Sequence, residues 1–165
     1  MSVVDVSVVI PTYNRLGQTM RAVESVALQT VLPKELIVVD DGSTQSMELL
    51  KQQINKIPFA RYLKIEKNSG VSVARNFGIE LATSQCLAFL DSDDYWLPEK
   101  LEKQYSYMIE YNYLISQTEE FWYRDQRFVN QSNKYRKPQG DIFEESVSLC
   151  AISPSAGVVF KTLFF

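Results

Sequence analysis

Residues 6–15 are VSVVIPTYNR, an apolar run that ends in a cluster of polar and turn-forming residues. The β-branched run Val6–Ile10 predicts a buried strand, and Pro11–Arg15 predicts the loop that leaves it. Further apolar residues then recur at helical spacing, namely Met20, Val23 and Ala27. This order of strand, polar loop and helix predicts the first unit of an α/β fold.

The same order repeats along the chain. Three more strand candidates are Leu36–Val39, Arg61–Ile65 and Cys86–Leu90, and a helical pattern separates each from the next. Strands that alternate with helices form mainly parallel sheets with helices on both faces. We therefore predict an α/β fold of this kind, with residues 1–165 forming one domain.

Apolar spacing also predicts the inward faces of two helices. The helix predicted at Val71–Leu81 has Arg75 and Glu80 on its outer face, and its inward face is expected to carry Ala74, Phe77, Gly78, Leu81 and Ala82. Pro98 and Glu99 suit the first turn of a later helix. The inward stripe of that helix is predicted at Leu101, Tyr105, Met108 and Ile109.

Polar clusters follow three of the predicted strands, at 11–15, 40–44 and 91–94. In the second cluster Gly42 permits a tight turn, and Ser43 or Thr44 is expected to cap the next helix. Ligands of open α/β sheets bind outside the carboxyl ends of the strands, so the three clusters are expected to converge on one crevice. Taken singly, Asp40 and Asp41 could merely cap a turn, and residues 91–94 could merely begin a helix near its dipole.

The third cluster has the composition of a metal site. Residues 89–94 are FLDSDD, so an apolar run delivers three carboxylates. Asp91 and Asp93 form an Asp-x-Asp pair, which can hold a dication between protein and diphosphate. The chain contains no histidine, so its metal ligands must be oxygens, which favours Mg²⁺ or Mn²⁺ over Zn²⁺.

These motifs, in this order, resemble those of the family 2 glycosyltransferases, which have the Rossmann-like GT-A fold and transfer a sugar from a nucleotide diphosphate donor. The matching segments are Val8–Arg15, Ile37–Ser43, Asn68–Gly78 and Phe89–Asp94. Gln117–Phe143 and Ile152–Ser155 further resemble a bacterial branch of this family, whose products are polysaccharides.

The resemblance implies a role for each matching residue. Thr12 and Tyr13 would line the pocket for the base, and Asp41 would accept a hydrogen bond from uracil or thymine. Pro11 and Ser92 would also belong to the donor-binding site. Arg15 and Arg75 would lie near the donor phosphates. Asp91 would contact the ribose side of the donor, Asp93 would hold Mn²⁺ or Mg²⁺, and Asp94 would support the loop.

The family's catalytic base is expected to be absent from this chain. It belongs to an acidic motif downstream of the strand matched by Gly157–Phe160, and Glu144 and Glu145 do not match that motif. We therefore expect a truncated enzyme, with a donor-binding half at residues 1–112 and the start of an acceptor-side half at 113–165. A general base usually contributes roughly 100- to 10,000-fold to the rate.

Three functional hypotheses follow. The principal one is an inverting, metal-dependent transferase that uses a UDP- or dTDP-sugar and a glycan or lipid-linked acceptor. The second is a catalytically silent module that binds nucleotide sugars. The third, a nucleotidyltransferase-like phosphate-binding domain, is less favoured because the chain has no glycine-rich phosphate loop.

The composition indicates which partners and which cellular compartment to expect for the protein. The net charge is −3, which argues against nucleic-acid binding, and Cys86 and Cys150 suggest a reduced, cytoplasmic protein. The basic stretch Arg124–Lys137 predicts a solvated hairpin or loop, with an acceptor-side or membrane-facing patch at the inner face of the membrane as the alternative. Trp96 and Trp122 are expected to pack rather than to bind sugar. A homodimer through a sheet edge is a further expectation.

Overall fold

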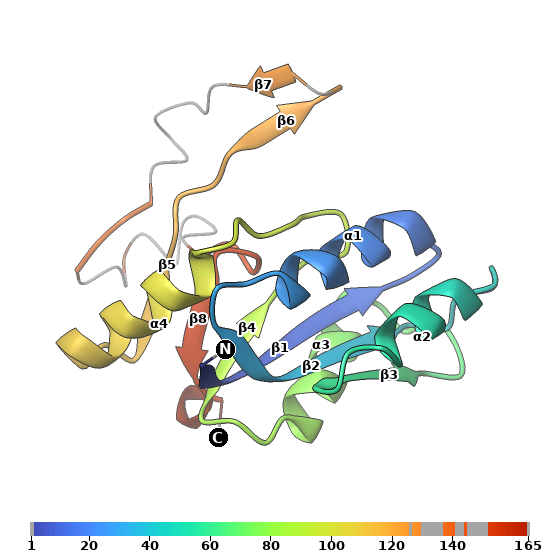
Figure 1. The fold of residues 1–165 in the computed structure, drawn as a ribbon, viewed down its shortest axis with the longest axis horizontal. Helices are drawn as coiled ribbons and strands as arrows, with labels where there is room; N and C mark the ends of the chain where they lie inside the picture. The colour runs from blue at the N-terminus through green and yellow to red at the C-terminus, as the bar shows by residue number, and fades with distance from the viewer. Residues whose placement is uncertain (1, 126, 130–136, 141–143, 145–151, 165) are drawn as a thin grey trace.

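The computed structural model describes residues 2–125, 127–129, 137–140, 144 and 152–164. Its strands are β1 (Val3–Thr12), β2 (Leu32–Asp40), β3 (Ala60–Lys64), β4 (Cys86–Phe89), β5 (Ile115–Gln117), β6 (Trp122–Arg124), β7 (Arg127–Val129) and β8 (Gly157–Phe160). Its helices are α1 (Leu16–Ala27), α2 (Glu48–Ile54), α3 (Val71–Leu81), α4 (Lys100–Tyr111) and the short 3₁₀ helix η2 (Lys161–Leu163). The four predicted strands are confirmed as β1 to β4, and strands and helices alternate as far as α4 (Figure 1).

The central sheet has six strands in the order β3-β2-β1-β4-β8-β5. Strands β3, β2, β1 and β4 are parallel, with Val8 of β1 opposite both Leu36 and Ala88. Strand β8 runs antiparallel to β4, and β5 runs antiparallel to β8. The chain winds outward from β1 to β3 and then crosses to β4 on the other side of β1, so the strand order reverses between β1 and β4. Such a reversal opens a crevice at the carboxyl ends of the two strands.

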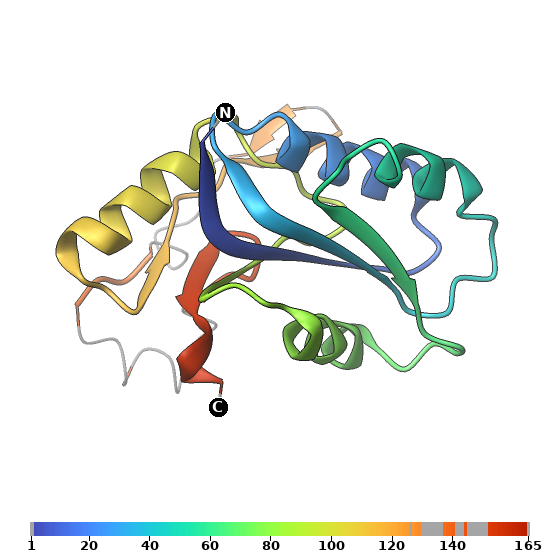
Figure 2. The ribbon, with the colours of Figure 1, turned by 60° about the horizontal axis from the view of Figure 1, so that its bottom comes forward.

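Helices cover both faces of the sheet, as predicted (Figure 2). On one face α1, α2 and α4 enclose the larger core, which includes Val8 and Ile10. On the other face α3 packs against Val9, because neighbouring strand residues point to opposite sides. Gly78 permits this contact, since a Cβ atom at that position would lie 2.4 Å from a Val9 methyl group.

The predicted inward faces of α3 and α4 agree only in part with the residues that are buried. Ala74 and Gly78 are buried in α3, but Phe77 and Leu81 are 37% and 36% exposed, and Ile79 is buried instead. Among the described helices α3 packs on this face without a neighbouring helix beside it, so its contact with the sheet covers a narrow stripe. In α4, Leu101 and Met108 are buried and Tyr105 is half-buried, but Ile109 is 52% exposed.

Two helix starts also differ from prediction. Helix α2 begins at Glu48 after Met47, so neither Ser43 nor Thr44 caps it. Both residues instead bond to Asn14 of the first loop. Helix α4 begins one residue after Glu99, so Pro98 and Glu99 precede its first turn rather than form it.

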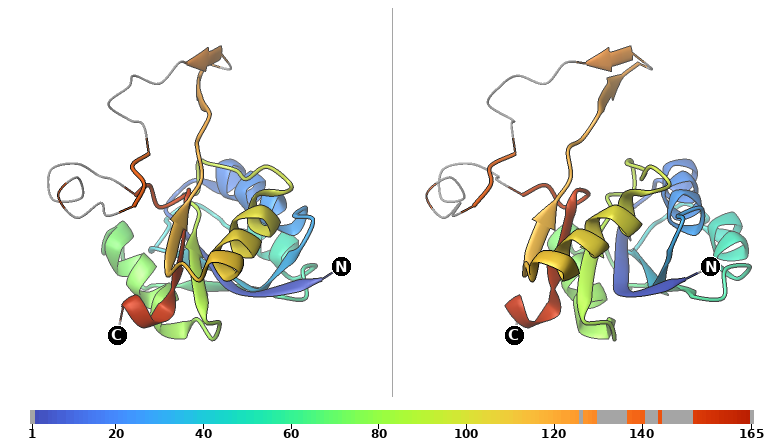
Figure 3. Two further views of the ribbon diagram at one scale, coloured as in Figure 1. Left: turned by 90° about the vertical axis from the view of Figure 1, so that its left-hand side faces the viewer. Right: turned by 60° about the vertical axis from the view of Figure 1, so that its left-hand side comes forward.

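Strands β6 and β7 form a hairpin that stands away from the sheet (Figures 1 and 3). Arg124 and Arg127 in it are exposed, which confirms the solvated hairpin for the described part of the basic stretch. Lys137 lies close to the body and pairs with Glu120 at 3.1 Å. Other residues discussed above lie outside the described part, namely Lys134, Arg136, 141–143, Glu145 and Cys150.

Cys86 is buried in β4, as expected, and this burial raises the pKa of its thiol to about 11. Within the described residues, no helix combines the length and apolar character needed to cross a membrane.

Candidate functional site

A pocket of about 480 Å³ opens at the carboxyl ends of β1, β2 and β4, where the strand order reverses. The structure brings all the residues predicted for the site to its walls: Pro11, Thr12, Tyr13, Arg15, Asp41, Arg75, Asp91, Ser92 and Asp93. Four further residues complete the lining: Asn68, Gly70, Val71 and Ala74. All four fall within the segment Asn68–Gly78, where spacing alone assigns them no role.

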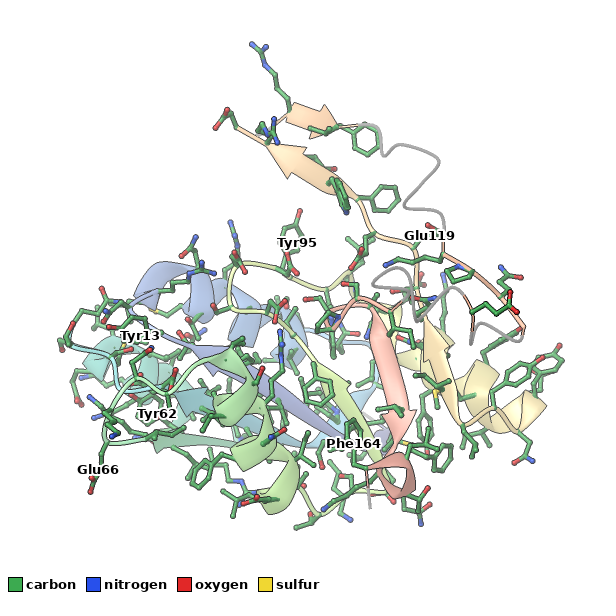
Figure 4. All side chains as sticks on the ribbon, turned by 180° about the vertical axis from the view of Figure 1, so that it is seen from behind. Tyr13, Tyr62, Glu66, Tyr95, Glu119 and Phe164 are labelled. Carbon is green, nitrogen blue, oxygen red and sulfur yellow. The ribbon has the colours of Figure 1, made fainter. Side chains whose placement is uncertain are left out.

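The first loop is fixed by Asn14, whose backbone has a φ of 51° in the left-handed region. Its Oδ1 accepts hydrogen bonds from the backbone N–H groups of Thr44 (2.9 Å) and Gln45 (3.1 Å), and its own N–H donates to the Ser43 hydroxyl (2.9 Å). These bonds join the loops that follow β1 and β2. Tyr13, which is 42% exposed, is thereby held at the pocket wall (Figure 4).

Asp41 holds the segment that precedes α3 at one wall of the pocket. Its Oδ1 accepts from the Ser69 N–H, and its Oδ2 accepts from the Gly70 N–H, both at 2.8 Å. The Asn68 amide adds a bond of 3.1 Å to Oδ2. A buried carboxylate thus holds residues 68–70 at the start of α3, and one lone pair of Oδ1 remains for a ligand.

Asp40 has the turn role that was considered for it. It is fully buried and accepts from the Ser43 N–H (2.8 Å) and from the Tyr62 hydroxyl. Burial and the adjacent Asp40 raise the pKa of Tyr62 well above its ordinary value. Asp40 therefore shapes the second loop and does not line the pocket.

Two ion pairs cross the pocket. Arg75 Nη2 lies 2.5 Å from Asp91 Oδ1, and Arg15 Nη1 lies 2.8 Å from Asp93 Oδ2. The side chains of the second pair are about half exposed, at 48% and 47%. The Nε of Arg75 is buried and has no hydrogen-bond partner among the described residues. The Arg75 Nε–H is thus a guanidinium donor at the pocket that no described residue satisfies.

Ser155, just before β8, holds the acidic loop in place. Its hydroxyl accepts from the Asp91 N–H (3.0 Å) and donates to Asp94 Oδ2 (2.6 Å). Its carbonyl accepts from the Trp96 indole (2.9 Å), and Trp96 is buried, as expected. Desolvation raises the pKa of Asp94, the Ser155 bond opposes this, and the neighbouring carboxylates add to the rise. The sequence marked Ile152–Ser155 only as a family resemblance and gave Ser155 no role.

The described residues contain no cluster of three or more acidic, cysteine or histidine side chains that would form a ready-made metal site. Two carboxylates nevertheless fit Mg²⁺ or Mn²⁺, because these ions usually take one or two protein carboxylates together with phosphate oxygens and water. Asp91 and Asp93 both line the pocket and both are partly exposed. Glu144 is exposed and lies outside the pocket lining.

Known proteins share this sequence and fold. The sequence model described as Glycosyl transferase family 2 matches residues 7–162. An uncharacterized glycosyltransferase of Rickettsia felis is 35% identical over 96% of this chain, which spans 26% of that relative. WfgD of Escherichia coli, described as UDP-Glc:alpha-D-GlcNAc-diphosphoundecaprenol beta-1,3-glucosyltransferase, is 32% identical over 96% of this chain and 61% of its own length.

The fold also matches a solved structure. S. aureus TarS 1–349 in complex with UDP-GlcNAc superposes with a TM-score of 0.76 and 25% identity, over 99% of this chain and 46% of the TarS 1–349 chain.

Proposed function

This chain belongs to glycosyltransferase family 2, and from that premise we propose that its pocket binds the nucleotide diphosphate sugar of a metal-dependent glycosyl transfer. The observation that carries the proposal is the convergence of an aromatic ring, two arginines and two carboxylates at one strand reversal. The UDP-GlcNAc complex of TarS and the UDP-glucose named for WfgD support a UDP-sugar as the donor.

We assign the base to the walls formed by Thr12, Tyr13 and Asp41. Tyr13 presents an exposed ring on which a flat pyrimidine can stack. Asp41 Oδ1 keeps an acceptor position for the N–H of uracil, because among the described residues it receives one hydrogen bond, from the Ser69 N–H. Pro11 and Ser92 line the same pocket.

The diphosphate lies between Arg15 and Arg75 in this proposal. In the ligand-free pocket the two guanidiniums neutralise Asp93 and Asp91. A dication and a diphosphate bring equal and opposite charge, so the arginines can turn to the phosphates while Asp93 binds the metal and Asp91 faces the metal and ribose. This exchange keeps the pocket neutral, and it gives the unsatisfied Arg75 Nε a phosphate partner.

The metal, when bound, would stabilise the charge that develops on the leaving nucleoside diphosphate. The protein's own contribution is to hold the donor in place, with Asp94 and Ser155 fixing the loop that carries Asp91 and Asp93. The acceptor named for WfgD, a sugar on a lipid diphosphate, supports a lipid-linked or glycan acceptor. Transfer with inversion at the anomeric carbon also requires a general base that deprotonates the acceptor hydroxyl. Asp91 and Asp93 do not fill this role in the proposal, because both bind the donor and its metal.

Isothermal titration of UDP and dTDP, with Mn²⁺, Mg²⁺ or a chelator, tests the donor site. We expect binding that requires the dication and falls at least about tenfold in Asp93→Asn, because one charged ligand is lost. Asp5→Asn is the matched control, since Asp5 forms a surface ion pair with Lys34 outside the pocket. Equal binding with metal and with chelator would refute the metal-dependent site.

A second assay distinguishes sugar transfer from donor binding alone. Release of UDP from a UDP-sugar in the presence of a glycoside acceptor indicates transfer. Metal-dependent binding without such release supports the silent binding module instead.

A further inference from the structure

A second pocket, of about 240 Å³, lies on the other side of the acidic loop. Its lining consists of Asp94, Phe121, Trp122, Tyr123, Arg124 and Val129. Residues 91–93 line the donor pocket and Asp94 lines this one, so a single loop separates the two. A ligand in the second pocket would lie next to the donor diphosphate.

The β6–β7 hairpin gives this pocket an aromatic and a cationic wall. Trp122 pairs with Val129 across the hairpin, and Arg124 pairs with Arg127. Because side chains alternate along a strand, Trp122, Arg124 and Val129 share one face. Tyr123 and Phe128 belong to the opposite face, where Phe128 contacts both Tyr123 and Phe121 at ring distances of 6.0 and 6.1 Å.

These rings are unusually exposed for their size. Phe121 is 64% exposed, Tyr123 is 59% exposed, and Trp122, which was expected to pack rather than to bind sugar, is 37% exposed. Tyr95, which is 50% exposed, projects from the loop on the side of the molecule from which the hairpin rises (Figure 4). Exposed aromatic groups beside a polar hollow are typical of ligand sites.

The polar groups of the pocket suit a hydroxyl-rich ligand. Asp94 Oδ2 is taken by Ser155, but Oδ1 makes no hydrogen bond among the described residues and can accept one from a hydroxyl. Arg124 supplies donors on the hairpin side. A pyranose ring has an apolar C–H face and a rim of hydroxyls, so an aromatic wall with one carboxylate and one guanidinium complements both.

We propose that Trp122, Asp94 and Arg124 form a subsite for the acceptor sugar. This inference rests on the proposed function, because the word acceptor presupposes a donor in the first pocket. The sugar ring packs on the aromatic wall, and a hydroxyl donates to Asp94 Oδ1. The position of the subsite places that ring at the end of the donor pocket where the diphosphate is expected.

The test combines two ligands on the full chain. The first is UDP with Mn²⁺, titrated calorimetrically. The second is a panel of methyl α-glycosides of glucose, galactose and N-acetylglucosamine, followed by saturation-transfer NMR in the presence of UDP. We expect at least one glycoside to bind wild type, to bind about three- to tenfold more weakly to Trp122→Ala, and to be largely restored by Trp122→Phe.

Phe128→Ala is the matched control, because Phe128 is an exposed ring of the same hairpin that contacts two lining residues, Phe121 and Tyr123, but does not line the pocket itself. It should leave glycoside affinity within about twofold, as expected for truncation outside a binding pocket. UDP affinity should be unchanged in all three variants, which also shows that they are folded.

Two outcomes would overturn the subsite. One is UDP binding to wild type without binding of any glycoside, which leaves the donor proposal intact. The other is an equal loss of glycoside affinity in Trp122→Ala and Phe128→Ala. Absence of UDP binding in wild type would count against the proposed function instead, and the glycoside measurement would still report on the pocket.

Discussion

Replacing Ser155 by alanine should weaken both the fold and the donor site. The change removes one hydroxyl that accepts from the Asp91 N–H at 3.0 Å and donates to Asp94 Oδ2 at 2.6 Å. The carbonyl of residue 155, which receives the Trp96 indole, is retained. The perturbation is therefore limited to the two bonds that tie the acidic loop to the segment before β8.

The expected loss of stability is about 2 kcal/mol. The hydrogen bond to Asp91 contributes about 1 kcal/mol. A hydrogen bond to a charged carboxylate usually contributes more than this. Because the Asp94 side chain is exposed, water can replace part of the lost bond, so we again expect about 1 kcal/mol. For a chain of this length, about 2 kcal/mol lowers Tm by roughly 4–8 °C. Metal-dependent UDP affinity should also fall, because the loop that carries Asp91 and Asp93 is less ordered.

Urea denaturation and UDP titration measure the two effects. Ser153→Ala is the matched control, since Ser153 lies in the same segment and its hydroxyl makes no hydrogen bond among the described residues. A loss of less than about 0.5 kcal/mol in Ser155→Ala, the usual range for surface substitutions, would contradict the role of the Ser155 hydroxyl. An expected loss of stability with unchanged UDP affinity would contradict its effect on the donor site.

Three further predictions concern other parts of the molecule. Gly78→Ala should destabilise the protein by about 1–3 kcal/mol in urea denaturation, because the new methyl group would overlap β1. As a control, the methyl group of Gly17→Ala in α1 meets nothing within 4 Å, so this change should stabilise the protein by up to about 1 kcal/mol. Similar stability changes in the two variants would contradict this prediction. Burial lowers the pKa of Lys100 to about 7 from 10.5, so the unfolded state binds more protons between these values. Unfolding free energy should therefore rise with pH in this window, by up to about 1.4 kcal/mol per unit, and Lys100→Met should remove the slope; an unchanged slope would exclude Lys100 as its source. Arg75→Lys keeps the charge but loses the planar fork, so metal-dependent UDP affinity should fall about tenfold in calorimetry; full affinity would argue against a phosphate contact.

Local sequence patterns were sufficient for the framework of the fold. Short apolar or β-branched runs bounded by polar loops predicted β1, β2 and β4, a weaker pattern predicted β3, and the polar residues directly after β1, β2 and β4 predicted the positions of the pocket walls. Both predictions depend only on neighbours in the chain, and parallel strands bring their carboxyl ends to one edge. The assignment of each residue to a base, phosphate or metal contact remains a prediction.

Apolar spacing was less informative for the helices. Phe77, Leu81 and Ile109 satisfy helical periodicity but are exposed. A pattern defines an apolar stripe, whereas the sheet decides how much of that stripe is covered. Similarly, Asp41 was expected to contact the ligand, and the structure shows in addition that it holds residues 68–70.

The sequence by itself determined the alternation of strands and helices in the donor half and the place of Asp91 and Asp93 at the end of a strand. Only the tertiary structure revealed that Ser155, 64 positions from Asp91, holds the acidic loop, and that Trp122 and Asp94 share a second pocket. The physical reason is that these contacts depend on β8 entering the sheet antiparallel beside β4 and on the hairpin rising beside the same loop. Neither the placement of β8 nor that of the hairpin is indicated by a periodic or local pattern in the sequence.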